Sequence, residues 1–495
     1  MRARRRPPGR GHGAGSRRLD RARGAAQPAR HASGDDVLLP LPGDVRLVLG
    51  TSWWLEEAAA AFGDDVSDPL EGPVDADVCI VGGGFTGLWT ALAVKERDPA
   101  AHVVLLEAER CGAGPSGRNG GFLHGYWASI GRARGVLGEA GALAVARAGE
   151  RVIPAVRALG EDVWLRESGM LTVSTTPEQD SALDASVEAA ALVGSPQQAV
   201  PLTRDEVAER IGSPVFRRGV FSPECATVQP ARLVRVLRRK AIDAGVALHE
   251  RSPARLEDLG GARSVVVATN AAATGWRPVR RHVTNFGSYV VLTEPVPDLL
   301  AEIGWTGGEA VIDGRMFIHY FRTTNDGRVL MGSGSGPIGF GGRVDARFTQ
   351  DAATAARAEQ GLRRLLPSLA GARVERAWGG PIDVSADHLP FFGTVSGTRI
   401  HYGLGYSGNG VGPSWLGGQI LASLALGLDD EWASLPLVRR PPSLPPEPFK
   451  RVGGGLVRAA ILAVEEAEEA GRRPPLAARV GAAVPRRLGM RIGTR

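Results

Sequence analysis

The sequence predicts an α/β protein in which a Rossmann-type dinucleotide-binding domain is interleaved with an α+β domain built on an antiparallel sheet. Residues 77–81 form a short, β-branched apolar run that stops at three consecutive glycines, as a strand does before a tight turn. A second apolar run, 102–106, ends in an acid. Further along, the alternation of antiparallel strands occurs in three runs, at 289–294, 316–321 and 328–332.

The glycine turn has the residues that a bound pyrophosphate needs. Gly82 allows the turn, Gly84 lets backbone N–H groups approach the phosphates, and Gly87 lets the following helix, 88–97, pack close to the strand. The positive end of that helix then faces the phosphates. The predicted cofactor contacts in this turn are Gly82, Gly84, Phe85, Thr86 and Gly87.

The acid at the end of the second run distinguishes this turn from an ordinary loop. Glycine-rich turns also arise simply to connect elements, so the motif alone is weak. Here a strand precedes it, a helix follows it, and Glu107 stands at the tip of the second strand. Its carboxylate can accept hydrogen bonds from a ribose diol and would repel a 2′-phosphate. Glu107 and the adjacent Ala108 are therefore predicted ribose-side contacts.

The segment after the second strand indicates a flavin rather than a nicotinamide. Residues 112–121, GAGPSGRNGG, are too rich in glycine for a regular helix or strand. A plain NAD domain would continue into a crossover helix here, whereas a buried FAD needs a second loop around its pyrophosphate and ribityl chain. The predicted contacts in this loop are Ser116, Arg118, Asn119, Gly120 and Gly121.

With this loop the sequence resembles the FAD-dependent amine oxidoreductases of the D-amino-acid oxidase, glycine oxidase and sarcosine oxidase superfamily. The run SGRNGG after an LEA-type strand is most similar to the γ-glutamylputrescine oxidoreductase branch. The resemblance covers roughly residues 45–430. Some relatives attach the flavin through a histidine in this loop, where this chain has Arg118 and Asn119, so non-covalent FAD is expected.

Two later segments extend the resemblance. A strand at 264–269 ends in Ala268, Thr269 and Asn270, like the ATN-type strand end at the cofactor in relatives. The turn 403–412, GLGYSGNGVG, precedes a helix at 413–426 and corresponds to the turn beside the flavin pyrimidine. Backbone N–H groups and a helix dipole there would stabilise negative charge on reduced flavin. The predicted contacts are Gly408, Asn409, Gly410 and Val411.

One segment departs from the family pattern. Between the strands 246–249 and 264–269, relatives insert a longer β-meander whose first strand contacts adenine, whereas this chain offers only 251–263. We expect at least one hairpin to be shortened or lost. This puts the adenine-side contact near 253–255 in question, and with it the affinity for FAD.

The substrate side offers three candidate residues. Tyr320 and Arg322 lie two apart in a YFR-type strand and should share one face of the sheet. Arg322 either binds a carboxylate or polar end of the substrate, or both residues are structural. His388 has a pKa suited to acid–base chemistry, although a histidine in a loop before proline is commonly a structural hydrogen-bonding group.

Composition restricts the class of protein. The net charge of +6 is misleading, because residues 1–34 hold ten arginines and one aspartate, which leaves the remainder near −3. This tail is interpreted as a disordered leader; a nucleic-acid arm or a transit-like segment is the alternative. No apolar run of about 18 residues occurs. Three scattered cysteines suggest a reducing compartment and neither a disulfide framework nor a metal site. A cytoplasmic location is expected.

The predicted domain organisation alternates along the chain. The FAD-binding domain and the substrate domain each return after an excursion, and both ends of the chain lie outside them. The predicted segments are a basic leader (1–40), FAD-binding (45–135), substrate (136–227), FAD-binding (228–275), substrate (276–375), FAD-binding (376–430), and a Pro-rich crossing with a C-terminal helix (431–495).

The predicted activity is oxidation of the CH–NH bond of a small amine or amino acid. A hydride passes to flavin N5, and water hydrolyses the resulting imine. The resemblance favours a polyamine derivative. O₂ or another carrier accepts the electrons. The resemblance implies a lysine near the flavin in sarcosine-type oxidases, and none of Lys95, Lys240 and Lys450 suits that position, so slow reaction with O₂ is expected.

Two alternatives remain open. One is an NAD(P)H-using flavoprotein reductase or monooxygenase, which normally needs a second nucleotide motif that this sequence lacks. The other is a catalytically impaired FAD-binding homologue. No nucleic-acid partner and no membrane span are predicted, and the sequence leaves the oligomeric state open.

Overall fold

The computed structural model describes residues 37–40 and 46–490. Most of the predicted leader, residues 1–36, lies outside the described residues. The last four residues of that segment form strand β1 (Val37–Pro40), which pairs antiparallel with β2 (Arg46–Leu49).

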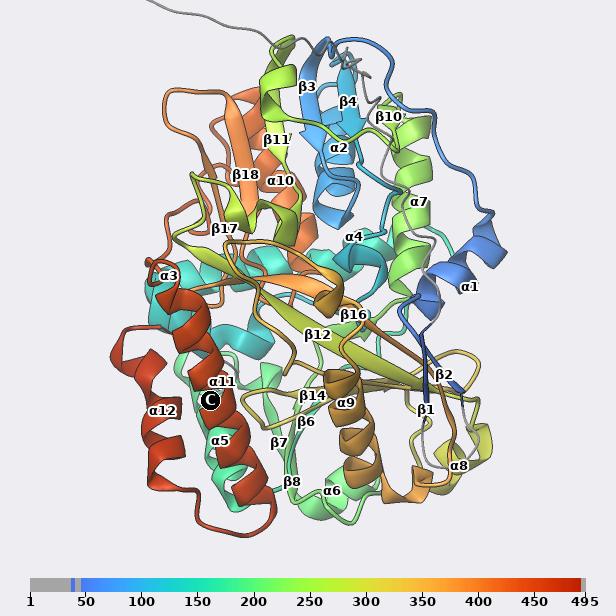
Figure 1. The fold of residues 1–495 in the computed structure, drawn as a ribbon, viewed down its shortest axis with the longest axis vertical. Helices are drawn as coiled ribbons and strands as arrows, with labels where there is room; N and C mark the ends of the chain where they lie inside the picture. Colours follow the sequence, from blue (N-terminus) through green and yellow to red (C-terminus); the bar gives the residue numbers. More distant parts are fainter. Residues whose placement is uncertain (1–36, 41–45, 491–495) are drawn as a thin grey trace, which may run out of the picture. The chain divides into compact units, whose positions relative to one another are not determined.

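A six-stranded sheet carries the predicted dinucleotide motif (Figure 1). Its strands β10, β4, β3, β11 and β18 run parallel, and β17 is antiparallel to β18. Both faces of β3 are covered: Val78 and Ile80 pack in one apolar cluster with α2 and α10, and Cys79 packs in a second cluster. Burial on both faces explains the continuous apolar run in the sequence. In sheet order, the bounds are β10 (Ala247–His249), β4 (Val103–Leu106), β3 (Ala76–Val81), β11 (Ala262–Val267), β18 (Ile400–Leu404) and β17 (Phe391–Thr394).

The second large sheet has ten strands and is mostly antiparallel (Figure 1). Among its described strands, parallel pairing occurs only where β16 meets β2 and where β13 meets β6. One face packs on α9 through Leu362, Leu365 and their neighbours. After β1 and β2, the sheet order continues with β16 (Val374–Ser385), β12 (Val283–Thr293), β15 (Val329–Ser333), β14 (His319–Thr323), β13 (Ala310–Asp313), β6 (Met170–Ser174), β8 (Arg218–Ser222) and β7 (Val200–Leu202).

The helices connect and cover these sheets. Strands β5 (Phe122–His124) and β9 (Cys225–Thr227) pair with each other as a separate two-stranded antiparallel ribbon. The helices are α1 (Trp53–Phe62), α2 (Phe85–Arg97), α3 (Ile130–Gly149), α4 (Val152–Arg157), α5 (Pro177–Leu192), α6 (Arg204–Ala208), α7 (Pro230–Asp243), α8 (Pro297–Glu302), α9 (Ala352–Leu365), α10 (Pro413–Leu426), α11 (Phe449–Glu469) and α12 (Leu476–Arg487).

The strands alternate between the two sheets in nearly the predicted order. The difference is β16, which pairs along its length with β12 in the large sheet. The third FAD-binding segment, 376–430, would therefore begin inside a strand of the other sheet. The limits of the domains stay a prediction. The single predicted C-terminal helix is in fact two, α11 and α12.

Candidate cofactor and substrate site

The glycine turn follows β3, at the point where the order of the strands in the parallel sheet reverses. Strands β3 and β11 are neighbours, and a Cβ on Gly82 would lie 2.6 Å from the Ala268 carbonyl oxygen. In open α/β sheets, ligands bind beyond the carboxyl ends of the strands at such a switch point. Gly82 has φ 114°, a value that favours glycine. A Cβ on Gly87 would lie 1.9 Å from the Gly82 oxygen, so the close approach predicted for that residue is present.

The loop after β4 crosses the N-terminus of α2. Ser116 Oγ accepts a hydrogen bond from the Phe85 backbone N–H at 3.0 Å, and a Cβ on Gly84 would lie 2.8 Å from the same oxygen. Thr86 Oγ1 shares a 2.8 Å hydrogen bond with the Tyr406 hydroxyl. The first turn of α2 therefore meets the 112–121 loop on one side and the 403–412 turn on the other.

Glu107 stands at the carboxyl end of β4, as predicted for a ribose-binding acid. Its Oε2 accepts a hydrogen bond from Gly83 N at 2.7 Å, and its Oε1 accepts one from Glu109 N at 3.0 Å. Burial raises the pKa of this carboxyl, and the two hydrogen bonds oppose the rise. Each oxygen keeps a lone pair that can accept a hydrogen bond from a sugar hydroxyl.

The 112–121 loop is held by side chains from outside it. Ser52 Oγ donates to Gly117 O at 2.8 Å, Trp54 Nε1 donates to Asn119 O at 2.9 Å, and Trp378 Nε1 donates to Arg118 O at 2.9 Å. Both indoles are fully buried. The Ser-Trp-Trp segment, residues 52–54, thus fixes two carbonyls of the loop, and Trp378 fixes a third.

A cavity of about 1760 Å³ adjoins this loop and the inner face of the large sheet. Of the predicted cofactor and substrate residues, it is lined by Arg118, Asn119, Gly120, Tyr320, His388, Gly408, Asn409 and Val411. The remaining predicted residues lie outside its lining: Gly82, Gly84, Phe85, Thr86, Gly87, Glu107, Ala108, Ser116, Gly121, Ala268, Thr269, Asn270, Arg322 and Gly410.

Asp383, near the end of β16, connects two of the predicted cofactor segments. Its carboxylate accepts a 2.9 Å hydrogen bond from Asn270 Nδ2 and a 2.5 Å bond from Gly405 N. Asn270 has φ 46°, which an asparagine tolerates. Burial raises the pKa of Asp383 to about 7, against the lowering effect of these hydrogen bonds. A single buried carboxyl thus fixes the strand end after β11 to the 403–412 turn.

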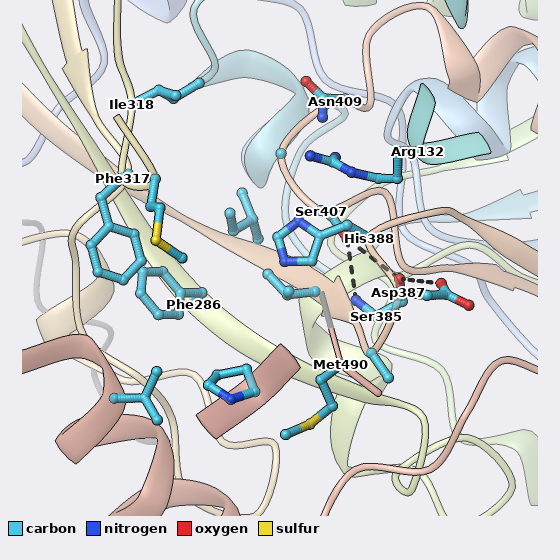
Figure 2. A pocket seen from close by; sticks show the side chains of 18 of the residues that line it. Arg132, Phe286, Phe317, Ile318, Ser385, Asp387, His388, Ser407, Asn409 and Met490 are labelled. Atoms are coloured by element: carbon cyan, nitrogen blue, oxygen red, sulfur yellow. Dashed lines mark hydrogen bonds between the residues drawn. The ribbon is translucent and has the colours of Figure 1, made fainter. Parts of the chain in front are cut away.

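Tyr320 and His388 line the cavity, and burial shifts the pKa of both side chains. Tyr320 shares a 2.8 Å hydrogen bond with Ser288 Oγ, and burial raises the pKa of its phenol to about 12. Burial and the nearby Arg132 lower the pKa of His388 to about 3. Figure 2 shows the His388 ring inside the cavity. At neutral pH the phenol is protonated and the imidazole is neutral, so both can form hydrogen bonds without carrying charge.

Arg322 shares the sheet face of Tyr320 but does not reach the cavity. Its side chain is fully buried and donates to Val228 O at 2.6 Å, Thr323 O at 3.1 Å and Gly121 O at 3.4 Å. Burial and Arg166 lower the pKa of the guanidinium to about 9. The substrate-binding role considered for Arg322 is therefore unsupported by its position, and the structural alternative fits the contacts.

Replacement of Arg322 tests this assignment. Arg322→Met removes the donor to the buried Val228 carbonyl, so we expect the free energy of unfolding to fall by about 2 kcal/mol while KM for substrate stays unchanged. Urea unfolding and steady-state kinetics measure the two quantities. A tenfold rise in KM with unchanged stability would instead show that Arg322 binds substrate.

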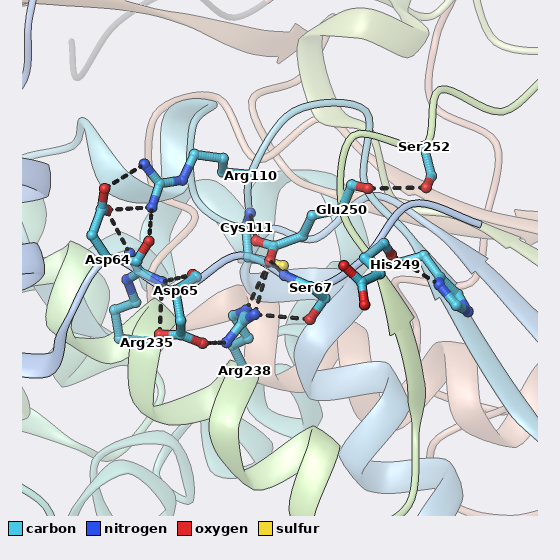
Figure 3. A network of polar contacts seen from close by, with 11 residues as sticks. Asp64, Asp65, Ser67, Arg110, Cys111, Arg235, Arg238, His249, Glu250 and Ser252 are labelled. Carbon is cyan, nitrogen blue, oxygen red and sulfur yellow. Dashed lines mark hydrogen bonds and ion pairs between the residues drawn. The ribbon is translucent and has the colours of Figure 1, made fainter. Parts of the chain in front are cut away.

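The segment between β10 and β11 lacks a β-hairpin, as expected from its short length. Between His249 and Ala262, all of which the structure describes, the chain forms one 3₁₀ turn, Leu256–Asp258, and no strand. The segment after α1 lies there instead. Glu250 Oε2 accepts a hydrogen bond from Ser67 N at 2.7 Å (Figure 3). Ser252 Oγ accepts one from Leu70 N at 2.8 Å.

The same network reaches the residue before the 112–121 loop. Glu250 is buried, its Oε1 accepts from Cys111 N at 2.7 Å, and Arg238 of α7 pairs with it at 2.9 Å (Figure 3). Arg238 also pairs with Asp65. The start of the 112–121 loop is thus fixed by α7 and by residues 64–70, without a β-meander.

The cavity's remaining walls had little signal in the sequence. Phe122 and Phe286 line it from β5 and β12, and residues from 439 onward contribute a further wall. Lys450, one of the three lysines judged unsuited to a place near the flavin, lines the cavity; its Nζ donates to Arg280 O at 3.3 Å and Val283 O at 3.4 Å.

The residues present fit a bound FAD. The turn at 82–87 has no room for side chains at three glycines, an acid stands at the tip of the next strand, and a second loop and a second glycine-rich turn border one cavity. Among the residues that the structure describes, no His, Cys, Asp and Glu cluster could hold a metal ion. No helix in the same part of the chain is long and apolar enough to cross a membrane. Fold and site define a two-domain protein with a Rossmann-type FAD-binding domain.

The chain belongs to the FAD dependent oxidoreductase family (DAO), whose family model matches residues 77–424. It is 27% identical over 390 residues to a probable oxidoreductase, OrdL, of Haemophilus influenzae, covering 74% of this chain and 86% of the relative. It is 28% identical over 393 residues to the γ-glutamylputrescine oxidoreductase of Escherichia coli, covering 74% and 88%. The family prediction, including its resemblance to that branch, is confirmed.

Solved structures agree on the fold. The glycine oxidase of Geobacillus kaustophilus superposes with a TM-score of 0.59 at 22% identity, over 74% of this chain and 99% of that one. A thermally stable mutant of a fructosyl peptide oxidase gives a TM-score of 0.60 at 16% identity, over 74% and 94%. The predicted fold class is therefore confirmed.

Proposed function

We propose that this protein uses non-covalent FAD to oxidise the CH–NH bond of a small amine that also carries an anionic group. The observation that carries the proposal is the convergence of the 112–121 loop, the 403–412 turn and the face of the large sheet on one cavity. Such an arrangement would give a flavin edge and a substrate the same enclosed space. The names of the relatives, glycine oxidase and γ-glutamylputrescine oxidoreductase among them, support an amine substrate.

The residues that would hold FAD come from four segments. The turn after β3 and Ser116 would bind the pyrophosphate at the N-terminus of α2, Glu107 the ribose, Asn119 and Gly120 the flavin chain, and residues 408–411 the ring. When bound, FAD supplies the acceptor for a hydride from the carbon next to a neutral amine. The loop has Arg118 and Asn119 where some relatives carry a histidine, which supports non-covalent binding.

The charges around the cavity bear on the substrate class. Nine basic side chains line it against three acidic ones, Glu178, Asp387 and Glu468. A free polyamine would be repelled by this field, whereas an amine with a carboxylate would be attracted. The basic residues are Arg118, Arg132, Arg439, Arg440, Lys450, Arg458, Arg473, Arg479 and Arg486.

The protein's own groups would bind and orient the substrate. The neutral His388 and the protonated Tyr320 can hydrogen-bond an amine without adding charge next to it. Apolar walls, including Phe122, Phe286 and Ile382, exclude water from the reacting bond. Water then hydrolyses the imine product after it leaves this enclosure.

An anaerobic absorbance spectrum tests the proposal. The protein should purify yellow, and its band at roughly 450 nm should bleach with one of γ-glutamylputrescine, sarcosine or glycine and less readily with putrescine. Bleaching by NADPH and by no amine would favour a reductase or monooxygenase. A colourless protein that takes up no FAD would favour an impaired homologue.

The rate of reaction with O₂ bears on the electron acceptor, and Lys450 is the lysine to test. Because backbone carbonyls hold its Nζ, and burial lowers its pKa, we expect reoxidation by O₂ to be slow. Lys450→Met should leave the reoxidation rate within a factor of about two, less than about 0.5 kcal/mol in the barrier. Stopped-flow absorbance measures it, with Lys240→Met on α7 as the control. Rapid peroxide production that Lys450→Met abolishes would contradict this expectation.

A further inference from the structure

The C-terminal helical hairpin, α11 with α12, lies beyond the segment matched by the family, which ends at residue 424. With the residue after it, the hairpin carries more than half of the large apolar side chains that are exposed in the described part of the chain. Of the thirteen large apolar side chains that are exposed in the described part of the chain, seven belong to this hairpin and the residue after it. They are Phe449, Val452, Leu456, Leu476, Val480, Val484 and Leu488.

The hairpin is anchored to the substrate-domain sheet. Glu465 of α11 is 2% exposed and accepts hydrogen bonds from Met316 N at 2.6 Å and Phe317 N at 3.1 Å. Arg364 of α9 pairs with Glu469 at 2.9 Å. Ile461 is fully buried. The exposed apolar side chains therefore belong to a helix pair in a fixed position on the body of the protein.

The exposed side chains of α12 form one stripe. Leu476, Val480 and Val484 follow one another at four-residue spacing and are 72%, 47% and 36% exposed. Ala478 and Pro485 are buried on the opposite side. An isolated exposed leucine needs no explanation, but a stripe along a whole helix indicates a surface that something covers.

The charge of this segment selects the kind of partner. Residues 470–490 contain no acidic side chain, and all five of their arginines are exposed: Arg472, Arg473, Arg479, Arg486 and Arg487. Two copies of the same face would bring like charges together. A nucleic acid would match the arginines and leave the apolar stripe in water. An anionic lipid surface matches both, since it offers phosphate groups beside acyl chains.

We propose that α12 lies in the interface of an anionic lipid bilayer, with its apolar stripe among the acyl chains and its arginines at the phosphates. Phe449 of α11, Val484 of α12 and Leu488 directly after α12 also line the cavity, so this docking brings that side of the cavity to the lipid surface. The proposal does not depend on the reaction proposed above, because it rests on the exposed face and its charge.

A fluorophore on the stripe tests the docking. Val480→Cys and, as a control of similar exposure on α7, Ile242→Cys are labelled with nitrobenzoxadiazole in the full-length protein. The native cysteines Cys79, Cys111 and Cys225 are buried and stay unlabelled. Vesicles of phosphatidylcholine mixed with phosphatidylglycerol should brighten and blue-shift the label at 480 and leave the label at 242 unchanged. Vesicles of phosphatidylcholine alone should change neither.

A second variant measures the contribution of the stripe. Leu476→Glu combined with Val480→Glu should weaken vesicle binding roughly a hundredfold in a flotation assay, since two buried aliphatic side chains are lost. Its flavin spectrum should match the wild type, which excludes misfolding. An unchanged label at position 480 with anionic vesicles, or equal changes at 480 and 242 as the basic N-terminal residues alone would give, overturns the proposal. A blue shift at 480 that follows protein concentration without vesicles shows a self-contact and also overturns it.

Discussion

Replacing Gly87 with alanine is expected to yield a protein that purifies without flavin. The new Cβ would lie 1.9 Å from the Gly82 carbonyl oxygen, where even a tight contact needs more than 3.0 Å. The start of α2 must then move away from the turn after β3, which opens the proposed pyrophosphate site. Overpacking of this kind costs about 3 kcal/mol, which corresponds to a roughly hundredfold loss of FAD affinity.

Gly114→Ala is the matched control for this experiment. Gly114 lies in the neighbouring loop with φ −76°, a value that alanine adopts, and a Cβ added there would have nothing within 4 Å. The ratio of absorbance at roughly 450 nm to protein absorbance, together with a titration of FAD into apoprotein, measures retention of the cofactor. Equal FAD affinity in both variants would show that the 82–87 turn does not hold the pyrophosphate.

The motif-bearing elements could be predicted because local sequence determines them. The strand before Gly82, the helix after it and the helix that begins at Pro413 each combine an apolar period with a glycine or proline at the boundary, and all three are present. The loss of at least one hairpin after β10 could also be expected, because this chain has only 251–263 where the family pattern has a longer β-meander.

The parts that were missed depend on contacts between distant residues. Strand β16 contains the turn-like pair Gly379–Gly380, and only its pairing with β12 makes it a strand. In the sequence, Arg322 resembles a substrate-binding residue. In the structure, its guanidinium donates hydrogen bonds to the carbonyls of Gly121 and Val228 instead. Lys450 reaches the cavity through the course of the chain after α10, which no motif indicates.

Two residues on the same face of a strand can also have different surroundings. Tyr320 and Arg322 share a face, as their spacing requires, yet only Tyr320 lines the cavity because Gly121 lies over Arg322. A Cβ on Gly121 would lie 2.7 Å from Arg322 Nη1. The site is therefore defined by which loop covers each strand residue, and a single sequence does not contain that information.

The buried Asp383 is expected to make the stability of the protein fall as pH rises. Its pKa is about 7 in the folded protein, raised by burial, and about 3.9 in an unfolded chain. Between these values the folded protein keeps a proton that the unfolded chain has released. Stability therefore decreases with rising pH by up to about 1.4 kcal/mol per unit, and becomes constant above the folded pKa.

Asp383→Asn removes this titration. From pH 5 to pH 7, we expect the free energy of unfolding of the wild type to fall by about 2 kcal/mol relative to the variant, because the slope decreases as pH approaches the folded pKa. Urea unfolding at a series of pH values measures the difference. Asp430→Asn is the control: burial acts to raise the pKa of Asp430, but hydrogen bonds from Ala433 N and Ser423 Oγ hold it below its usual value. Its contribution is then constant above about pH 5.

A parallel pH dependence in wild type and Asp383→Asn would mean that Asp383 is ionised throughout this range. The carboxylate would then act as a charged acceptor for Asn270 and Gly405. In that case it would place a negative charge beside the 403–412 turn, where the proposed function requires donors for an anionic flavin. Protonated Asp383 can therefore fix the 403–412 turn without opposing the negative charge on the flavin that the turn would stabilise.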